Sequence, residues 1–379
     1  MIYLDYAANS PVDKDVLNTF YDTSNKYFAN PNSFHKLGLE AKKLIDEATI
    51  NIAKNLNVLP EEIIYTSGAS ESNNLAIKGI CERYKSVGNH IIVSTLEHNS
   101  VIAPSAVMQE LGFDVEVAPV NKDGLIDLEE LQKMLRNDTI LVSICSVDSE
   151  IGIKQPIEEI AKILKKYPNC HFHTDASQAI GKTFVDFSDV DLITIAPHKF
   201  YGLNGTGLLI KKKGVSLKPI INGGKSTTVY RSGTPVLGEI LSINIALDKA
   251  LKLESDRTKY VTNLNKIIID DLKRYEDVII NNTKNSIPYT INISIKGIKS
   301  LEFAKKLEEK DIYVSTKTSC CPIESPSKLV YALTQDKSLA NSSLRISISH
   351  LTTIDEVNTF LKIFNDIYKE LKNEKISRN

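Results

Sequence analysis

Short apolar runs alternate with longer amphipathic segments over residues 36–250 of this 379-residue chain. The runs are rich in β-branched residues, show little period-two alternation and are bounded by Gly, Pro, Asp or Ser, which is typical of strands covered on both faces. They are EIIYTS (62–67), HIIVST (90–95), DVEVAP (114–119), TILVSI (139–144), CHFHTD (170–175), DLITIA (191–196) and GLLIKK (207–212). The pattern predicts an α/β fold with a mostly parallel, seven-stranded sheet between helices.

The segments between these runs have the spacing of amphipathic helices. In the segment around residues 37–56, Leu37, Ala41, Leu44, Ala48 and Ile52 would lie on one face of a helix. After a helical stretch over 245–275, the pattern predicts strands at 287–295, 311–316 and 344–349 and helices at 300–310 and 354–371, which is typical of a smaller α+β domain. We therefore predict an N-terminal arm (1–15) on the small domain, a large domain (16–250) and a small domain (251–379), with a frayed tail from residue 372.

Charge and composition exclude several classes of partner. The chain has 46 basic and 47 acidic residues, so no global field would attract nucleic acid or an anionic membrane. It contains neither a signal-like N-terminal segment nor a run of apolar residues long enough to span a membrane. We expect a cytoplasmic protein whose five cysteines stay reduced.

Polar residues follow several of the predicted strands, at the sheet edge where open α/β folds bind ligands. The first such segment, YTSGASESNN (65–74), runs through a Gly/Ser turn into a helix and could present amide groups and the Ser70 hydroxyl to a phosphate. The same pattern is typical of an ordinary helix N-cap.

Asp175 follows another predicted strand, in HFHTDASQA (171–179). His171, His173 and Asp175 would share one strand face, which permits a metal site. No further His/Glu pair at ligand spacing supports that interpretation, so we expect no metal, and the alternative for Asp175 is an N-cap.

Lys199 and His98 follow two further strands, in APHKFYG (196–202) and TLEHNS (95–100). A lysine partly desolvated at a sheet edge has a lowered pKa and can form a Schiff base, although either residue alone is also typical of a surface loop or a packed histidine. A carboxylate, a lysine, a histidine and a phosphate cradle at successive strand ends match the needs of pyridoxal phosphate.

The motifs that carry this chemistry also identify a family. The chain resembles the NifS/IscS cysteine desulfurases, fold-type I pyridoxal-phosphate enzymes of the aminotransferase class V group, from residue 2 to about 355. The resemblance rests on IYLDYAANSPVD, NPNSFHKLG, TSGASESNNLAIKG, EHNSV, HTDASQAIGK, HKFYG, RSGT and SSLRISI, in this order. It implies a homodimer that converts L-cysteine to L-alanine.

The resemblance also implies roles for individual residues. Lys199 would bind the cofactor covalently, Asp175 would pair with its pyridine nitrogen and Gln178 with its phenolic oxygen, while His98 would stack on its ring and move protons. Arg345 would bind the substrate carboxylate, a task suited to a guanidinium. The phosphate would be held by Ala69, Ser70 and His198, together with Thr234 of the other subunit.

Two adjacent cysteines, Cys320 and Cys321, lie in TKTSCCPIESPSKL (316–329). The resemblance assigns Cys320 as the nucleophile that takes the substrate sulfur as a persulfide, and thiolate chemistry predicts that its pKa is lowered. Cys321 could accept the sulfur, form a polysulfide or only fill space. The sulfur would pass to an acceptor protein, either an iron–sulfur scaffold or a tRNA-thiolation enzyme.

Several positions depart from the family pattern. Ser149 replaces an asparagine that faces the substrate, Ala196 replaces a serine that contacts the phosphate, and Lys225 and Lys317 add positive charge in loops. These changes leave two alternatives open. The protein could be a related pyridoxal-phosphate lyase or aminotransferase that acts on selenocysteine or another amino acid, or it could be a non-catalytic scaffold that keeps the fold.

Overall fold

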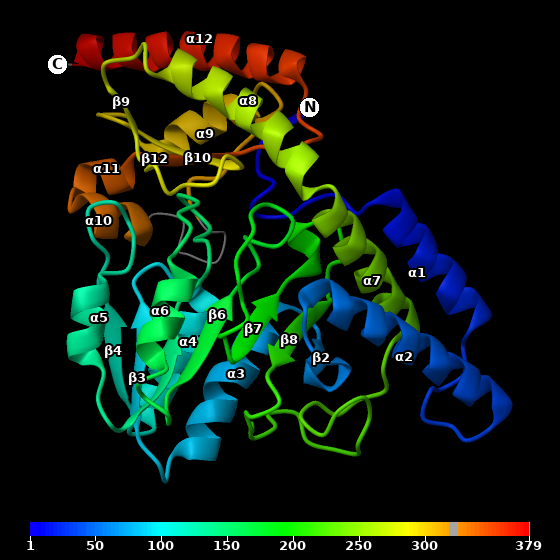
Figure 1. Cartoon of the computed structure of the whole chain (residues 1–379). Helices are drawn as coiled ribbons and strands as arrows, with labels where there is room; N and C mark the ends of the chain where they lie inside the picture. Colours follow the sequence, from blue (N-terminus) through cyan, green and yellow to red (C-terminus); the bar gives the residue numbers. More distant parts are fainter. Residues whose placement is uncertain (318–324, 379) are drawn as a thin grey trace.

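The computed structural model describes residues 1–317 and 325–378 (Figure 1). Its centre is a seven-stranded sheet in the order β2-β8-β7-β6-β5-β3-β4. Strand β8 is antiparallel to its neighbours β2 and β7, and all other neighbours are parallel. The strands are β2 (Ile63–Thr66), β3 (His90–Ser94), β4 (Asp114–Ala118), β5 (Thr139–Ser143), β6 (His171–Asp175), β7 (Leu192–Ile195) and β8 (Gly207–Lys211). The predicted fold class is confirmed.

Both faces of this sheet are buried, which explains why its strands lack period-two alternation. Ile64 and Ile91 pack on one face with helices α3 (Ala69–Tyr84) and α4 (Asn99–Glu110). Their chain neighbours Ile63 and Ile92 pack on the opposite face, in a cluster that also holds residues of α6 and α7. That side carries α5 (Leu128–Met134), α6 (Ile157–Leu164) and α7 (Leu237–Lys252).

Helices α1 (Lys14–Lys26) and α2 (Lys36–Leu56) pack on α7 beside the sheet (Figure 1). Their buried residues include Ala41, Ala48 and Ile52 of the predicted stripe, whereas Leu37 is exposed. Helix α7 ends at Lys252 and α8 (Glu254–Leu272) begins two residues later, which places a helix break near the predicted domain boundary. The domain boundaries themselves stay a prediction.

The C-terminal part forms a separate three-stranded antiparallel sheet in the order β12-β10-β9. It lies above the large sheet in Figure 1, together with helices α8, α9 and α12. Its elements are β9 (Val278–Ile280), β10 (Thr290–Ile295), α9 (Ser300–Glu308), α10 (Lys328–Thr334), α11 (Lys337–Asn341), β12 (Ser343–Ser347) and α12 (Ile354–Arg378). This arrangement agrees with the predicted α+β character.

The first residues of the chain join the two parts. Strand β1 (Ile2–Tyr3) pairs in parallel with β11 (Ile312–Tyr313). Leu4 is fully buried, and Asp5 forms a β-bridge with Ser347 at the end of β12. Further along, Ser10 donates to the carbonyl of His198 through both its amide (3.0 Å) and its hydroxyl (2.7 Å).

Three details differ from the sequence-based expectation. The predicted strand 311–316 is reduced to β11, which pairs with β1, and Ser315 beyond it forms a single β-bridge with Arg345 of β12. Edge strand β4 is an exception to the burial of both faces of the sheet, since Asp114 and Val117 are exposed and Val115 and Glu116 are half-buried. The predicted fraying from residue 372 is wrong for the backbone, since α12 continues to Arg378.

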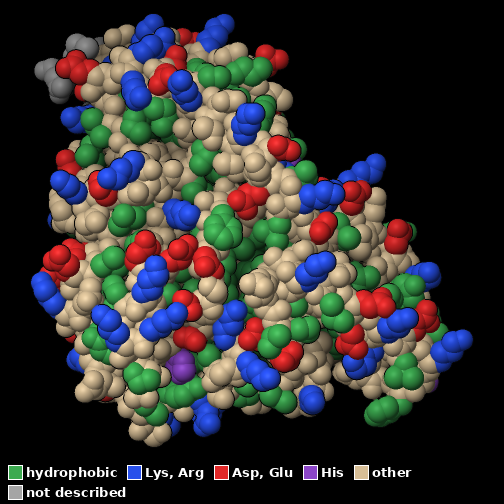
Figure 2. Space-filling model, in the orientation of Figure 1, with side chains coloured by type: hydrophobic (Ala, Val, Ile, Leu, Met, Phe, Trp, Pro, Cys, Tyr) green, Lys and Arg blue, Asp and Glu red, His purple; other side chains and the backbone are tan. Residues whose placement is uncertain are grey.

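The surface shows no concentration of one charge on the face in Figure 2, where acidic and basic side chains are interspersed. Among the helices of the described residues, none combines the length and apolarity that a membrane span requires.

Candidate active site

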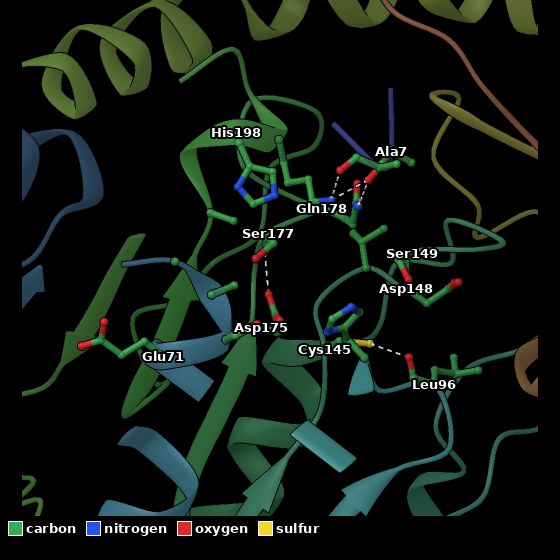
Figure 3. A pocket seen from close by; sticks show the side chains of 18 of the residues that line it. Ala7, Glu71, Leu96, Cys145, Asp148, Ser149, Asp175, Ser177, Gln178 and His198 are labelled. Carbon is green, nitrogen blue, oxygen red and sulfur yellow. Dashed lines mark hydrogen bonds between the residues drawn. The ribbon is translucent and has the colours of Figure 1, made fainter. Parts of the chain in front are cut away.

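A cavity of about 360 Å³ opens at the carboxyl ends of the parallel strands (Figure 3). It is bounded by the segments that follow β2, β3, β5, β6 and β7, by Arg345 of β12 and by Ala7 and Ala8 of the N-terminal segment. The predicted site residues that line it are Ala69, Ser70, His98, Ser149, Asp175, Gln178, His198, Lys199 and Arg345. The structure therefore brings together predicted site residues that are up to 276 positions apart in the sequence, namely Ala69 and Arg345.

Asp175 is the last residue of β6 and is 8% exposed. Its Oδ2 accepts a hydrogen bond from Asn73 Nδ2 at 2.8 Å, and its Oδ1 accepts one from the Ser177 amide at 3.0 Å. Asn73 also donates to Ser100 Oγ at 2.8 Å. The carboxylate is thus held in one orientation at the cavity wall, where it can pair with a cationic group of a ligand.

The two histidines of the predicted metal set do not face the cavity. Both ring nitrogens of His173 are hydrogen-bonded to hydroxyls of neighbouring strands, Nδ1 to Ser143 (2.8 Å) and Nε2 to Thr194 (3.1 Å). His171 packs its ring against Tyr84, with 4.3 Å between the centroids. His173 therefore acts as a buried crosslink within the sheet.

Lys199 lies at the end of a 3₁₀ turn (Pro197–Lys199) that follows β7. Its Nζ donates to the main-chain oxygens of Ala7 (2.9 Å) and Ala8 (2.6 Å). Gln178 Nε2 donates to the same Ala7 oxygen at 2.9 Å, and Gln178 Oε1 accepts from Lys182 Nζ at 2.7 Å. Main-chain carbonyls of the N-terminal segment therefore hold the Lys199 amine at the cavity.

Two histidines at the cavity are neutral near pH 7. Burial lowers the pKa of His98, and its Nδ1 contacts the hydroxyl and accepts from the amide of Ser100 (2.8 and 3.1 Å). Burial and the nearby Lys199 lower the pKa of His198 to about 4. A neutral imidazole can accept or stack without adding charge to the site.

The N-terminus of α3 lies beside these residues and points amide groups at the cavity. Gly68 precedes the helix with φ of +146°, a backbone conformation that favours glycine. Glu71 in the first turn accepts from the Ser67 amide (2.7 Å) and pairs with Arg231 Nε (2.9 Å). Because Arg231 offsets the charge of Glu71, the helix end remains suited to an anion.

Arg345 is 1% exposed and reaches the cavity from the small sheet. Its Nη1 donates to the Ser149 main-chain oxygen (2.8 Å) and its Nη2 to Asp5 Oδ1 (2.7 Å). Its Nε is buried without a hydrogen-bond partner among the described residues. The second hydrogens of Nη1 and Nη2 are therefore the donors that remain for a ligand.

Sequence reasoning did not identify Cys145 and Glu97 as neighbours of the site. Cys145 lines the cavity, and burial together with Glu97 raises the pKa of its thiol well above the usual value. Burial raises the pKa of Glu97 to about 8, although its Oε1 accepts from Ser94 Oγ and the Cys145 amide, each at 2.6 Å. A thiol in this state is a poor nucleophile.

Asn73, Lys182, Ser177 and Asp5 were also missed, because their contacts become visible only when distant segments meet. Ser177 lines the cavity, and its Oγ is buried without a partner in the described parts of the chain. Thr234 lies outside this cavity and lines a neighbouring one with Arg231. Cys320 and Cys321 lie outside the described residues.

Comparisons with known proteins agree with this arrangement. Residues 2–360 match the aminotransferase class-V family. A protein of Dictyoglomus turgidum named cysteine desulfurase IscS is 37% identical over 377 residues, which cover 98% of this chain and 95% of that protein. A protein of Lactobacillus delbrueckii named NifS/IcsS protein homolog is 36% identical, with 97% of each chain covered.

Solved structures have the same fold over nearly the whole chain. A structure described as a NifS-like protein superposes with a TM-score of 0.91 at 32% identity and covers 98% of this chain and 99% of its own. A structure described as SspA in complex with cysteine has a TM-score of 0.81 at 29% identity and covers 93% of this chain and 100% of its own. The chain therefore belongs to the aminotransferase class-V family.

Proposed function

We propose that the protein is a pyridoxal-phosphate-dependent cysteine desulfurase that converts L-cysteine to L-alanine and retains the sulfur as a persulfide on Cys320. The convergence of Lys199, Asp175 and Arg345 on one cavity carries the proposal. An amine, a carboxylate and a guanidinium suit an aldehyde cofactor, its ring nitrogen and an amino-acid carboxylate, respectively. The names of the relatives and the cysteine bound in the SspA structure support the choice of substrate.

The residues at the cavity fit pyridoxal phosphate. Asp175 would hold the pyridine nitrogen, Lys199 would bind the aldehyde, and the amides at Ala69 and Ser70 would hold the phosphate. The buried, unpartnered hydroxyl of Ser177 is a further donor at this wall and could offset the serine missing at Ala196. His198 and, from the second subunit of a homodimer, Thr234 would complete the cradle.

The chain's own residues bind the substrate and move its protons. Bound pyridoxal phosphate supplies a ring that stabilises the negative charge left when the Cα proton is removed. Arg345 would bind the substrate carboxylate with its remaining donors, next to Ser149. Lys199 would take the Cα proton and His98, neutral near pH 7, would move a proton between substrate atoms.

The resemblance to the NifS/IscS desulfurases assigns the sulfur step to Cys320, and the other three cysteines outside its loop are poor candidates. Cys81, Cys145 and Cys170 are buried, and burial raises the pKa of all three thiols. The Cys320 thiolate would attack the substrate sulfur, forming an S–S bond while the C–S bond breaks and a proton is delivered to the carbon, so that L-alanine leaves. A thiol of the acceptor protein would then take the outer sulfur and restore Cys320.

Three further expectations stay predictions. The acceptor is an iron–sulfur scaffold or a tRNA-thiolation enzyme, the protein is a cytoplasmic homodimer, and Cys321 accepts the sulfur, forms a polysulfide or only fills space. The alternative of a related lyase or aminotransferase that acts on selenocysteine or another amino acid rests on Ser149. The scaffold alternative is less favoured, because the amine and carboxylate of the cofactor site are both present.

The test measures L-alanine and sulfide released from L-cysteine with a thiol reductant, for wild type, Cys320→Ala and Cys321→Ala. Equal amounts of both products from wild type and Cys321→Ala, with neither from Cys320→Ala, support the proposal. Turnover that survives Cys320→Ala would favour the selenocysteine lyase, which needs no such thiol. A colourless protein that releases neither product would favour the scaffold.

A further inference from the structure

We infer that Asp5 is a positioning residue for substrate recognition: its carboxylate fixes the Arg345 guanidinium so that the remaining donors face the cavity. The inference rests on the proposed function and names a residue that the function itself did not require. It also makes the N-terminal segment a working part of the active site.

The contact between the two side chains is short and largely desolvated. Arg345 Nη2 lies 2.7 Å from Asp5 Oδ1, and the side chains are 1% and 18% exposed, respectively. Asp5 is the carboxylate paired with this guanidinium among the described residues, and its Oδ1 acts as a hydrogen-bond acceptor at a fixed position. The Ser149 carbonyl accepts from Nη1 at 2.8 Å, so the plane of the guanidinium is held at two points.

Asp5 is held in place independently of Arg345. Before it, the Leu4 amide donates to the Tyr313 carbonyl at 2.9 Å, and the Leu4 carbonyl accepts from the Ser347 amide at 2.7 Å. After it, the Ala7 amide donates to Ser347 Oγ at 2.9 Å. Hydrogen bonds on both sides of Asp5 therefore fix its main chain without using the Arg345 side chain.

The same segment holds the other end of the site. The oxygens of Ala7 and Ala8 accept from Lys199 Nζ at 2.9 and 2.6 Å, two and three residues beyond Asp5. A substrate amino acid must reach Arg345 with its carboxylate and Lys199 with its reacting carbon. The N-terminal segment thus sets the distance between the two groups that grip the substrate.

A competing interpretation is that Asp5 only occupies Arg345 and repels the incoming carboxylate. The two interpretations predict opposite changes. If Asp5 positions the arginine, shortening its side chain weakens L-cysteine binding, and an isosteric acceptor rescues it. If Asp5 competes, removing its charge tightens L-cysteine binding in every variant.

The first test compares Asp5→Ala and Asp5→Asn in the yellow holoenzyme. We expect Asp5→Ala to raise the KM for L-cysteine by roughly 10-fold or more with kcat changed less than about 3-fold, and Asp5→Asn to stay within about 3-fold of wild type. Cysteamine has the amine and thiol of cysteine without its carboxylate, so its affinity, read from the cofactor absorbance, should not change. Asp5→Ser serves as a second shortened variant if Asp5→Ala does not fold.

Asp13→Ala is the matched control. Asp13 lies in the same segment and pairs with Lys249 at 2.7 Å, away from the cavity. We expect it to lower thermal stability without changing the KM for L-cysteine. If Asp13→Ala and Asp5→Ala raise this KM equally, the segment acts only through its general rigidity and the inference is wrong.

The second test does not depend on turnover. Phenylglyoxal modification followed by peptide mass mapping reports the accessibility of Arg345, with the exposed Arg274 as internal reference. We expect Arg345 to react several-fold faster in Asp5→Ala than in wild type or Asp5→Asn. An unchanged rate, or a lower KM in both variants, overturns the inference, whereas failure to desulfurate cysteine would overturn only the proposed function.

Discussion

Lys182 Nζ lies 2.7 Å from Gln178 Oε1, so a buried lysine holds the amide that faces the cavity. The contact fixes the orientation of the Gln178 amide: Oε1 faces Lys182, and Nε2 donates to the Ala7 carbonyl. Lys182 is 9% exposed, and burial together with Lys199 and Arg345 lowers its pKa to about 7. A lysine in this position costs stability at neutral pH and is explained by the site it supports.

We predict that Lys182→Met changes the pH dependence of stability. In the unfolded chain the amine is protonated up to its ordinary pKa of 10.5, whereas in the folded protein it loses its proton near pH 7. Between these values the unfolded state binds more protons, so wild-type stability rises with pH, and this contribution is lost as pH falls towards 7. The unfolding free energy of Lys182→Met minus that of wild type should therefore be largest at pH 7. This difference should decrease by roughly 3 kcal/mol between pH 7 and pH 10.

Urea unfolding of both proteins at pH 7, 8.5 and 10 measures this difference, and other titrating groups cancel between them. Lys43→Met, which removes a lysine that is 76% exposed, is the control and should show a constant difference. A constant difference for Lys182→Met as well would mean that Lys182 keeps its proton in the folded protein.

Asn73 orients Asp175, and we predict that Asn73→Ala weakens cofactor binding. The side chain is fully buried and donates to Asp175 Oδ2 at 2.8 Å. Hydrogen bonds to charged groups contribute about 1.5–3 kcal/mol, so the Kd for pyridoxal phosphate should rise by roughly 10-fold or more.

Equilibrium dialysis of the cofactor with apoprotein tests this expectation. Asn74→Ala is the control, since Asn74 Nδ2 donates to the Ser70 carbonyl in the preceding turn of the same helix. Equal losses in the two variants would assign the effect to helix α3 in general and not to Asp175.

The sheet was predictable because each strand is an apolar run between breakers, and burial on both faces leaves that local signature. The site could be located for a similar reason. Asp175 ends β6, and His98 and Lys199 lie shortly after the ends of β3 and β7 at the same edge, so their convergence follows from parallel order. Their roles came from a resemblance and not from spacing.

Other parts of the site leave no local signature. Asp5 and Arg345 are 340 positions apart, and no pattern within either segment indicates that they meet. In the sequence, Lys182 of AIGK (179–182) is typical of a surface lysine, whereas it is buried in the structure. Tertiary contacts of this kind depend on how the small domain and the N-terminal segment pack on the sheet, which propensity does not encode.

Gly207 faces the beginning of α3, where the phosphate cradle is expected. A Cβ at this position would lie 2.6 Å from the Gly68 Cα and carbonyl carbon and 2.6 Å from Thr66 Oγ1. These are main-chain atoms and a hydroxyl that is bonded to Ser72 Oγ at 2.8 Å, so they cannot move independently. We predict that Gly207→Ala lowers the unfolding free energy by about 1–3 kcal/mol. We also expect it to displace the backbone N–H groups of Ala69 and Ser70.

The matched control for this prediction is Gly214→Ala, since a Cβ at Gly214 has no atom within 4 Å, and its stability should change by less than about 0.5 kcal/mol. Binding of pyridoxal phosphate is then compared with binding of pyridoxal, which lacks the phosphate. If the α3 terminus holds the phosphate, Gly207→Ala weakens only the first ligand, because the contacts of Asp175 and Lys199 are common to both. Equal weakening of both ligands would mean that the substitution disturbs the sheet edge as a whole, and the phosphate would have to be assigned to other groups at the cavity.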